Sequence, residues 1–320
     1  MTTIQASAPG VVCIGETMGL FRASQVGPLI HSRGYELGIG GAESNVAVAL
    51  RRLGVDVAWV GRLGADTLGD LIVHELRGEG VLVHAARDRD APTGMMLKER
   101  RTDDLTRVTY YRRDSAGSRL SVSDLPLDLI AGARILHVTG ITPALSASAR
   151  EAVIEAIRFA RGAGTLVSFD VNFRRTLWDV EAASSTLPEL IAHTDILFAG
   201  TEEARILGAD GEPAQLMSSL ADLGPQQVVV KLGKDGCAAL IDGQEFGRAA
   251  VPIRPVDTVG AGDAFAAGYL AELLAGAAPE LRLETANRCG AFACLAPGDW
   301  EGLPTRSELS ALDAEEGVLR

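Results

Sequence analysis

Cysteines are scarce in this sequence, and a secretory leader is missing. Its 320 residues hold four cysteines without a C-x-x-C pair, and the first ten residues contain neither a basic nor an apolar leader segment. We therefore predict a protein of the reducing cytoplasm. Cys289 and Cys294 have no neighbouring partners for a zinc site, so we interpret the cysteines as small buried hydrophobic side chains.

Long apolar runs and an excess of positive charge are also missing. The longest weakly charged apolar stretch, residues 264–278, is interrupted by Glu272 and is shorter than the roughly 20 residues that a membrane-spanning helix needs. The 30 Lys and Arg against 42 Asp and Glu give a net charge of -12, which does not attract nucleic acid or an anionic membrane. We expect neither as a partner, and an anionic ligand must find a local basic patch.

Short apolar runs alternate with longer segments of helical spacing, in a chain whose 47% hydrophobic and 22% charged residues are typical of a folded protein. The pattern predicts strands buried on both faces at residues 11–14, 55–60, 135–138, 165–169, 196–198 and 227–232. It predicts helices at residues 42–53, 68–79, 146–163, 182–191 and 202–207. This alternation indicates an α/β fold with a parallel sheet.

Residues 93–111 break the alternation. MMLKER and RVTYYRR alternate polar and apolar residues around the turn signal Thr102, Asp103 and Asp104, which is typical of a β-hairpin. With residues 20–37 the hairpin is predicted to form a small antiparallel sheet standing off the main domain, which we interpret as a lid. Its unpaired edges and apolar face predict that the same sheet of a second subunit covers it, in a homo-oligomer.

A first glycine-rich segment, residues 38–45 (GIGGAESN), leads directly into a helical pattern. It fails as a dinucleotide-binding fingerprint, because Glu43 occupies the sixth position of G-x-G-x-x-G and no strand immediately precedes it. Two interpretations stay open. The segment is a tight turn with a helix cap, or its missing side chains let a small polar ligand approach the backbone, with Asn45 as donor and acceptor.

A second glycine-rich segment, residues 257–263 (DTVGAGD), also precedes a helical pattern. Small residues at a helix start leave backbone N–H groups free to point at an anion, and the helix dipole adds to that attraction, which indicates a phosphate cradle. It is not a Walker loop, since Asp235 follows Lys234 where Ser or Thr is needed. Asp263 is either a helix-cap carboxylate or a base that deprotonates an attacking hydroxyl.

Together the two segments resemble the signatures of the PfkB-type, or ribokinase-like, carbohydrate kinases. Residues 40–64 match the first signature and residues 257–270 the second, about 200 residues later. The resemblance implies one kinase domain over residues 1–320, a three-layer α/β/α domain with a small β-sheet lid formed by segments at about 20–37 and 92–116. It is most specific for members that phosphorylate 2-keto-3-deoxygluconate, on residues 110–112 with 115–118, 140–145, and 170–174 with 176–178.

The resemblance also implies roles for individual residues. Asp263 is the catalytic base, with an anion hole formed by Gly260, Ala261 and Gly262. Sugar-acid contacts are implied for Gly41, Tyr110, Arg112, Arg174 and Asp299, to which we add the polar Asn45. Positions around ATP are Asn172, Gly200, Lys231, Gly233, Gly236 and Asn287. Glu203 matches the acidic member of an N-x-x-E motif that organises Mg²⁺ through water.

The implied reaction transfers the γ-phosphoryl group of ATP to the terminal hydroxyl of 2-keto-3-deoxygluconate. This chain departs from the family pattern at Gly200, where N-x-x-E has Asn, and at Met96, where a Tyr often touches the substrate. A ribokinase- or fructokinase-like enzyme and a non-catalytic sugar-binding protein are the alternatives. A nicotinamide dehydrogenase would need a glycine fingerprint after the first strand, which residues 13–18 do not supply.

The charge of the hairpin is an argument independent of the resemblance. Residues 98–119 hold seven basic and four acidic side chains, a net +3 within a chain of -12. These charges either face solvent or bind an acidic substrate, because guanidinium groups suit a carboxylate. A neutral sugar would not need Arg112 and Arg174.

Overall fold

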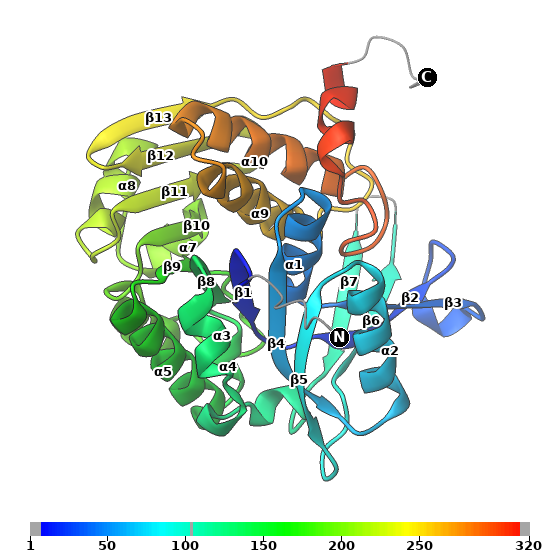
Figure 1. Cartoon of the computed structure of the whole chain (residues 1–320). Helices are drawn as coiled ribbons and strands as arrows, with labels where there is room; N and C mark the ends of the chain where they lie inside the picture. Colours follow the sequence, from blue (N-terminus) through cyan, green and yellow to red (C-terminus); the bar gives the residue numbers. More distant parts are fainter. Residues whose placement is uncertain (1–7, 103–104, 314–320) are drawn as a thin grey trace, which may run out of the picture.

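The computed structural model describes residues 8–102 and 105–313, and its main feature is a nine-stranded sheet in the order β13-β12-β11-β10-β9-β8-β1-β4-β5 (Figure 1). The strands are β1 (Val11–Ile14), β4 (Val57–Gly64), β5 (Leu82–Asp88), β8 (Ile135–Thr139), β9 (Leu166–Asp170), β10 (Ile196–Gly200), β11 (Gln227–Lys231), β12 (Cys237–Ile241) and β13 (Gln244–Arg248). Neighbours pair in parallel from β11 to β5, whereas β12 and β13 pair antiparallel. The predicted parallel sheet is therefore mixed.

Helices cover both faces of this sheet. Val11 and Cys13 pack into one core with α1 (Ala42–Arg52), α2 (Thr67–Gly78), α9 (Ala261–Leu274) and α10 (Pro279–Ala293). Val12 and Ile14 point the other way, into a core with α3 (Leu127–Gly132), α4 (Thr142–Leu145), α5 (Ala147–Ala163), α6 (Val180–Ile191), α7 (Thr201–Ile206) and α8 (Pro213–Ala221). Alternate residues of a strand face opposite sides, so a strand that is apolar throughout needs both layers. The predicted three-layer α/β/α fold is confirmed.

A second sheet of four strands has the order β3-β2-β6-β7 and lies at the right of Figure 1. Its strands are β2 (Met18–Ala23), β3 (Tyr35–Gly40), β6 (Met95–Arg100) and β7 (Thr106–Tyr111). The predicted hairpin is formed by β6 and β7, while Asp103 and Asp104 of its turn lie outside the described residues. The pair β2 and β6 is parallel, so the prediction of a wholly antiparallel small sheet is wrong.

The strands that the sequence pattern missed lie near the edges of the large sheet. In β12 buried residues alternate with partly exposed ones, in β5 the one buried residue is Asp88, and β13 has no buried residue, so none forms a continuous apolar run. The 3₁₀ helices among the described residues are η1 (Leu29–His31), η2 (Gly117–Arg119), η3 (Val122–Asp124), η4 (Gly233–Asp235) and η5 (Arg306–Asp313).

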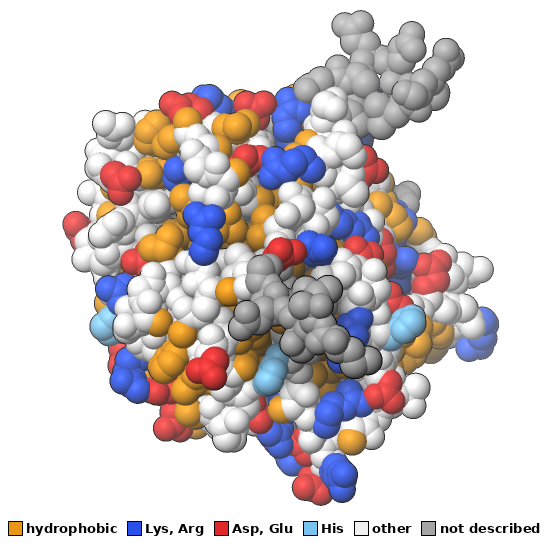
Figure 2. All heavy atoms as spheres, in the orientation of Figure 1, with side chains coloured by type: hydrophobic (Ala, Val, Ile, Leu, Met, Phe, Trp, Pro, Cys, Tyr) orange, Lys and Arg blue, Asp and Glu red, His pale blue; other side chains and the backbone are white. Residues whose placement is uncertain are grey.

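The described helices include none with the length and apolar character that a bilayer crossing requires. On the face drawn in Figure 2, basic and acidic side chains are interspersed. That face presents no broad basic field of the kind that binds nucleic acid.

Candidate active site

Two cavities meet where the parallel strands of the large sheet end. The first cavity, of about 430 Å³, lies between this edge and the small sheet, from which Met18, Met96 and Tyr110 line it. The second cavity has a similar volume, about 430 Å³. Both are lined by Lys231, Thr258 and Gly262. In parallel sheets this edge is the usual ligand site, because the loops that follow the strands converge there.

Asp263 lies in the first turn of α9 and lines the first cavity. Its Oδ2 accepts a hydrogen bond from Asn45 Nδ2 at 2.8 Å, and its Oδ1 accepts one from Asn172 Nδ2 at 3.3 Å. Burial raises the pKa of Asp263 to about 7, and Asp170 adds to this rise, whereas Asn45, Arg174 and Lys231 oppose it. A carboxyl group with such a pKa is suited to accept a proton near neutral pH.

The start of α9 is shaped by Gly260, which has φ +80°. A side chain there would be strained, and its Cβ would lie 2.0 Å from the carbonyl oxygen of Asp299. The first turn of the helix lies where the cavities meet, because Gly262 lines both of them, and the Ala261 N–H donates to the Thr258 carbonyl at 3.4 Å. The next N–H groups, at Gly262 and Asp263, have no acceptor within the helix, as is usual for a first turn, and such groups can bind an anion.

Lys231 ends β11 at the wall common to both cavities. Its Nζ donates to both oxygens of Asp170, at 2.8 and 2.7 Å. Burial opposes the charge of Lys231, but Asp170 and Glu203 outweigh this effect and raise its pKa, so it stays a cation. The first cavity and the second thus share one partly exposed positive charge.

A buried ion pair connects the small sheet to the loop after β1. Arg112 follows β7 and donates to Glu16 Oε2 from Nε at 2.7 Å and from Nη2 at 2.5 Å. The Arg112 guanidinium also lies 5.5 Å from the centre of the Tyr110 ring. Arg174, which lines the same cavity, has no carboxylate within ion-pair distance among the described residues and donates only to the Phe173 carbonyl.

A second buried ion cluster connects β6 to the segment that precedes α9. Lys98 Nζ lies 2.6 Å from Asp257 Oδ2 and 2.9 Å from Asp299 Oδ1, and its side chain is 1% exposed. Burial raises the pKa of Asp299, and Lys98 opposes that rise. Lys98 and Arg112 are the two of the seven basic residues at 98–119 that line the cavity, and both are paired with carboxylates from elsewhere.

The second cavity is lined mainly by backbone and apolar side chains. Gly233 and Gly236 flank η4 at one wall, and residues 250–253 and Phe265 contribute apolar surface. Asn287 of α10 lines it and donates from Nδ2 to the carbonyl of Ala249 at 3.1 Å. Such a surface suits a flat heterocycle with few specific polar contacts.

The structure gathers most of the predicted site residues in these cavities. The first cavity is lined by Gly41, Asn45, Tyr110, Arg112, Asn172, Arg174, Glu203, Lys231, Gly260, Gly262, Asp263 and Asp299, and the second by Lys231, Gly233, Gly236, Ala261, Gly262 and Asn287. Asn172, which is predicted to lie near ATP, lines the first cavity and donates to Asp263 Oδ1. Gly200 lines neither cavity, and its N–H donates to Glu203 Oε2 at 2.6 Å.

Sequence reasoning missed Glu16 and Lys98 as residues of the site. Lys98 was counted only as a charge of the hairpin. Glu16 gave a usable signal, since an acidic residue directly after a buried strand belongs to the edge where ligands bind.

The described residues contain no group of three or more His, Cys, Asp or Glu side chains placed to hold a metal ion. Glu203 lines the first cavity, and its two oxygens accept the N–H groups of Phe173 and Gly200 at 2.9 and 2.6 Å. Each carboxylate oxygen keeps further acceptor capacity for water. Glu203 therefore fits Mg²⁺ that is held mainly by phosphate and water, which is how this ion is commonly bound.

Comparison with known proteins identifies similar chains over nearly the whole length. Residues 8–306 match the model of the pfkB family carbohydrate kinases. A 2-dehydro-3-deoxygluconokinase of Bacillus subtilis is 38% identical over 96% of both chains, and one of Thermoproteus tenax is 34% identical over 94% of this chain and 93% of its own. The crystal structure of a PfkB protein from Polaromonas is 36% identical and superimposes with a TM-score of 0.87, covering 95% of this chain and 100% of that one.

Proposed function

The chain belongs to the pfkB family of carbohydrate kinases, and we propose that it transfers the γ-phosphoryl group of ATP to the terminal hydroxyl of 2-dehydro-3-deoxygluconate, also called 2-keto-3-deoxygluconate. The observation that carries this proposal is the position of Asp263. Asp263 lines the first cavity from the first turn of α9, and Gly262 of the same turn lines both cavities. A hydroxyl in one cavity and a phosphate at that junction would meet beside a base and an anion site.

In the proposed reaction Asp263 accepts the proton of the substrate hydroxyl. The hydroxyl oxygen then forms a bond to the γ-phosphorus, while the bond between this phosphorus and the bridging oxygen of ADP breaks. The N–H groups at Ala261 and Gly262 and the ammonium of Lys231 stabilise the charge on the transferring group, which is the largest contribution that a protein makes to phosphoryl transfer. Asn45 and Asn172 fix the carboxylate through hydrogen bonds at 2.8 and 3.3 Å.

A sugar acid is the proposed acceptor because of the charge in the first cavity. Within residues 8–102 and 105–313, Arg174 has no carboxylate partner and Nη1 of Arg112 has no hydrogen-bond partner. Two guanidinium groups that can donate to a carboxylate suit an acid better than a neutral sugar. Asp299 and Gly41 line the same cavity and are proposed to contact the rest of the substrate.

ATP is the proposed phosphoryl donor, with its base and ribose in the second cavity and its phosphates toward Gly262. Gly233, Gly236 and Asn287 line that cavity. Mg²⁺ is the proposed cofactor, and when bound to the phosphates it neutralises part of their charge. Glu203 would hold water molecules of this ion.

We also propose a homo-oligomer of the cytoplasm. The small sheet exposes Tyr35, Leu37 and Tyr111 by 44%, 54% and 56%, and a second copy of this sheet would cover such apolar side chains. The cysteines Cys13, Cys237, Cys289 and Cys294 are free and buried, which suits a reducing compartment.

A coupled assay of ADP release tests the proposal. The purified protein is offered 2-keto-3-deoxygluconate, its galactonate epimer, gluconate, fructose and ribose with ATP and Mg²⁺. The expected result is a kcat/KM for 2-keto-3-deoxygluconate about 10²-fold or more above that for fructose and ribose, the scale of two charge-assisted hydrogen bonds. A neutral sugar as best substrate would leave the kinase family intact and refute the sugar-acid assignment.

A further inference from the structure

Glu16 is a buried carboxylate that uses both oxygens to hold neighbours at the first cavity. Oε2 accepts Nε and Nη2 of Arg112, and Oε1 accepts the hydroxyl of Ser115 at 2.6 Å. The Glu16 side chain is 1% exposed. A Cβ at Gly117 would lie 2.4 Å from Glu16 Cγ, so the missing side chain at Gly117 leaves the space that Glu16 occupies.

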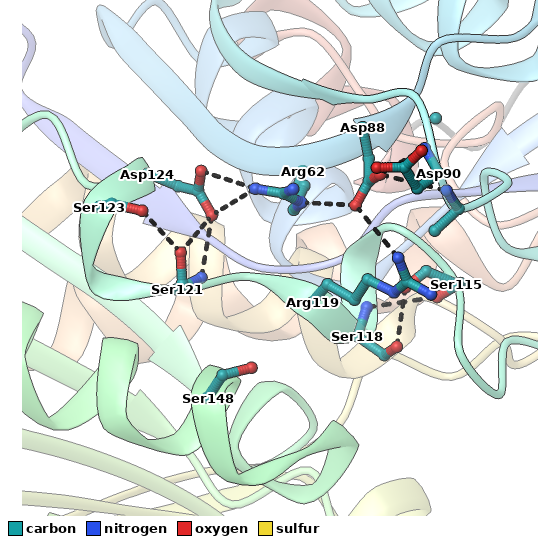
Figure 3. Close-up of polar contacts among 12 residues, drawn as sticks. Arg62, Asp88, Asp90, Ser115, Ser118, Arg119, Ser121, Ser123, Asp124 and Ser148 are labelled. Atoms are coloured by element: carbon teal, nitrogen blue, oxygen red, sulfur yellow. Dashed lines mark hydrogen bonds and ion pairs between the residues drawn. The ribbon is translucent and has the colours of Figure 1, made fainter.

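The loop that supplies Ser115 is itself fixed by buried polar contacts. The Ser118 hydroxyl donates to the Ser115 carbonyl at 2.7 Å. Figure 3 shows Arg62 between Asp88 and Asp124, with Ser115 and Ser118 beside Arg119. Arg62 bonds Asp88 at 3.0 Å and Asp124 at 3.0 and 3.2 Å, which attaches the loop after β7 to β4 and β5. Glu16 therefore accepts from Ser115 of an anchored loop with one oxygen and from Arg112 with the other.

Arg112 has one bound edge and one free edge. Nε and Nη2 point to Glu16, while Nη1 has no hydrogen-bond partner among the described residues, and the guanidinium lines the cavity. Glu16 neutralises the Arg112 charge, so the pair has little net charge with which to attract an anion. What it offers an anion is mainly one N–H donor, Nη1, in a fixed direction.

We infer that Glu16 is a positioning residue for substrate specificity, which holds Arg112 so that Nη1 donates to the carboxylate of the sugar acid. This inference rests on the proposed function. A negative charge beside an acid-binding arginine would otherwise only weaken binding of the acid. Positioning and net charge therefore make opposite predictions when the charge of Glu16 is removed.

The test is Glu16→Gln, assayed with ATP on the sugar acid and on fructose. If Glu16 positions Arg112, KM for the acid rises about 10-fold or more, and kcat for the acid changes by a smaller factor than KM. KM and kcat for fructose stay within about twofold of the wild-type values. If only net charge matters, KM for the acid falls because a carboxylate has left the cavity. A lowered or unchanged KM overturns the inference.

A double-mutant cycle with Arg112→Met shows whether Glu16 acts through Arg112. In the Arg112→Met background we expect Glu16→Gln to change KM for the acid less than about twofold, since the positioned group is gone. An equal effect in both backgrounds would overturn the inference. Ser115→Ala keeps all charges and removes one bond to Glu16, so it should raise KM for the acid in the same direction by a smaller factor, even if Glu16→Gln folds poorly.

Glu155→Gln is the matched control, because Glu155 also pairs with an arginine, Arg158, at 2.5 Å, but on the outer helix α5. This variant should keep wild-type constants. If the wild type prefers another sugar acid, the cycle is run on that acid and only the proposed substrate fails. A wild type that acts only on neutral sugars refutes both the proposed sugar-acid substrate and the inference about Glu16.

Discussion

The two cavities that meet at Gly262 are lined by different kinds of residue. Eight residues that line the first cavity carry an ionisable charge, whereas Lys231 and Lys234 are the charged residues of the second. The first is formed in part by side chains of the small sheet, while the second is formed by glycines, prolines and apolar residues around α9 and α10. Side-chain charge thus dominates one cavity, and backbone shape dominates the other.

This difference indicates where selectivity resides. Charged groups held in fixed positions discriminate strongly between ligands, because a ligand that lacks the matching group leaves their remaining donors and acceptors unsatisfied. An apolar slot distinguishes ligands mainly by size and shape. Changes in the first cavity should therefore alter which sugar reacts, and changes in the second should alter nucleotide affinity.

The largest effect is expected at the junction of the cavities. Asp263→Asn removes the proposed base and should lower kcat by about 10²-fold or more, the usual scale for a positioned general base. Binding of ATP and of the sugar acid, measured by calorimetry, should persist, because the Asn side chain fills the same space. Turnover like the wild type would refute the assignment of Asp263.

The same substitution should stabilise the fold at high pH. The pKa of Asp263 is raised from its ordinary value to about 7, so the folded state binds this proton more tightly than the unfolded state does. The free energy of unfolding contributed by this group therefore falls as pH rises from about 4 to about 7. Urea unfolding should show a larger gain for Asp263→Asn at pH 8 than at pH 5.

The pH profile is the second largest effect. A base acts only when deprotonated, so kcat/KM should rise about tenfold per pH unit up to an inflection near pH 7 and then level off. Arg174 lowers the pKa of Asp263, so Arg174→Met should move the inflection to higher pH. The profile is measured with initial rates at saturating ATP. A flat profile between pH 5 and 8 would contradict a base with this pKa.

The two arginines of the first cavity should differ in how they affect the sugar acid. Arg174 has no carboxylate partner among the described residues, whereas Arg112 is neutralised by Glu16. We expect Arg174→Met and Arg112→Met each to raise KM for the acid by about 10-fold or more and KM for fructose by less than about threefold. Raising the salt concentration should weaken acid binding more in Arg112→Met, which keeps the unpaired Arg174, than in Arg174→Met. Equal effects on acid and neutral sugars would refute the sugar-acid reading.

The layers and the position of the site could be predicted from sequence. Continuous apolar runs identified β1, β8, β9, β10 and β11, because a strand buried on both faces has no polar side. The glycines and Asp263 before a helical pattern identified the helix turn that lines the cavities. The outer strands β12 and β13 were missed, because alternating or exposed strands resemble loops in a single sequence.

The pairing of charges could not be predicted. Lys98 and Arg112 stand in a basic hairpin, and their sequence neighbours suggested free positive charges. Their partners Asp257 and Glu16 are 159 and 96 residues away in the chain, so only the tertiary structure brings them together. Periodicity reports local structure, whereas the charge of a site depends on such distant pairs.

The smallest effect is expected for glycines of the second cavity, where two residues form a matched comparison. Gly236 has φ +99°, and a Cβ there would lie 2.0 Å from the carbonyl oxygen of Arg248. Gly233 has φ +61°, and its Cβ would meet nothing within 4 Å. Gly233→Ala strains the backbone by about 1 kcal/mol. Gly236→Ala strains it more, because ψ is -128° at this residue, close to a backbone region that is essentially limited to glycine, and it must also displace the end of β13.

We therefore expect Gly236→Ala to lower the free energy of unfolding by about 2 kcal/mol or more and to raise KM for ATP several-fold. Gly233→Ala should lower the free energy of unfolding by about 1 kcal/mol and change KM for ATP by less than about threefold. Neither should change the preference for acid over neutral sugars, because neither touches the first cavity. Urea unfolding and steady-state kinetics on the same preparations check this. Suppose instead that Gly236→Ala altered sugar selectivity as strongly as Arg174→Met. The first cavity would then not determine sugar selectivity independently of the second, and selectivity would have to be assigned to the junction that the two cavities share.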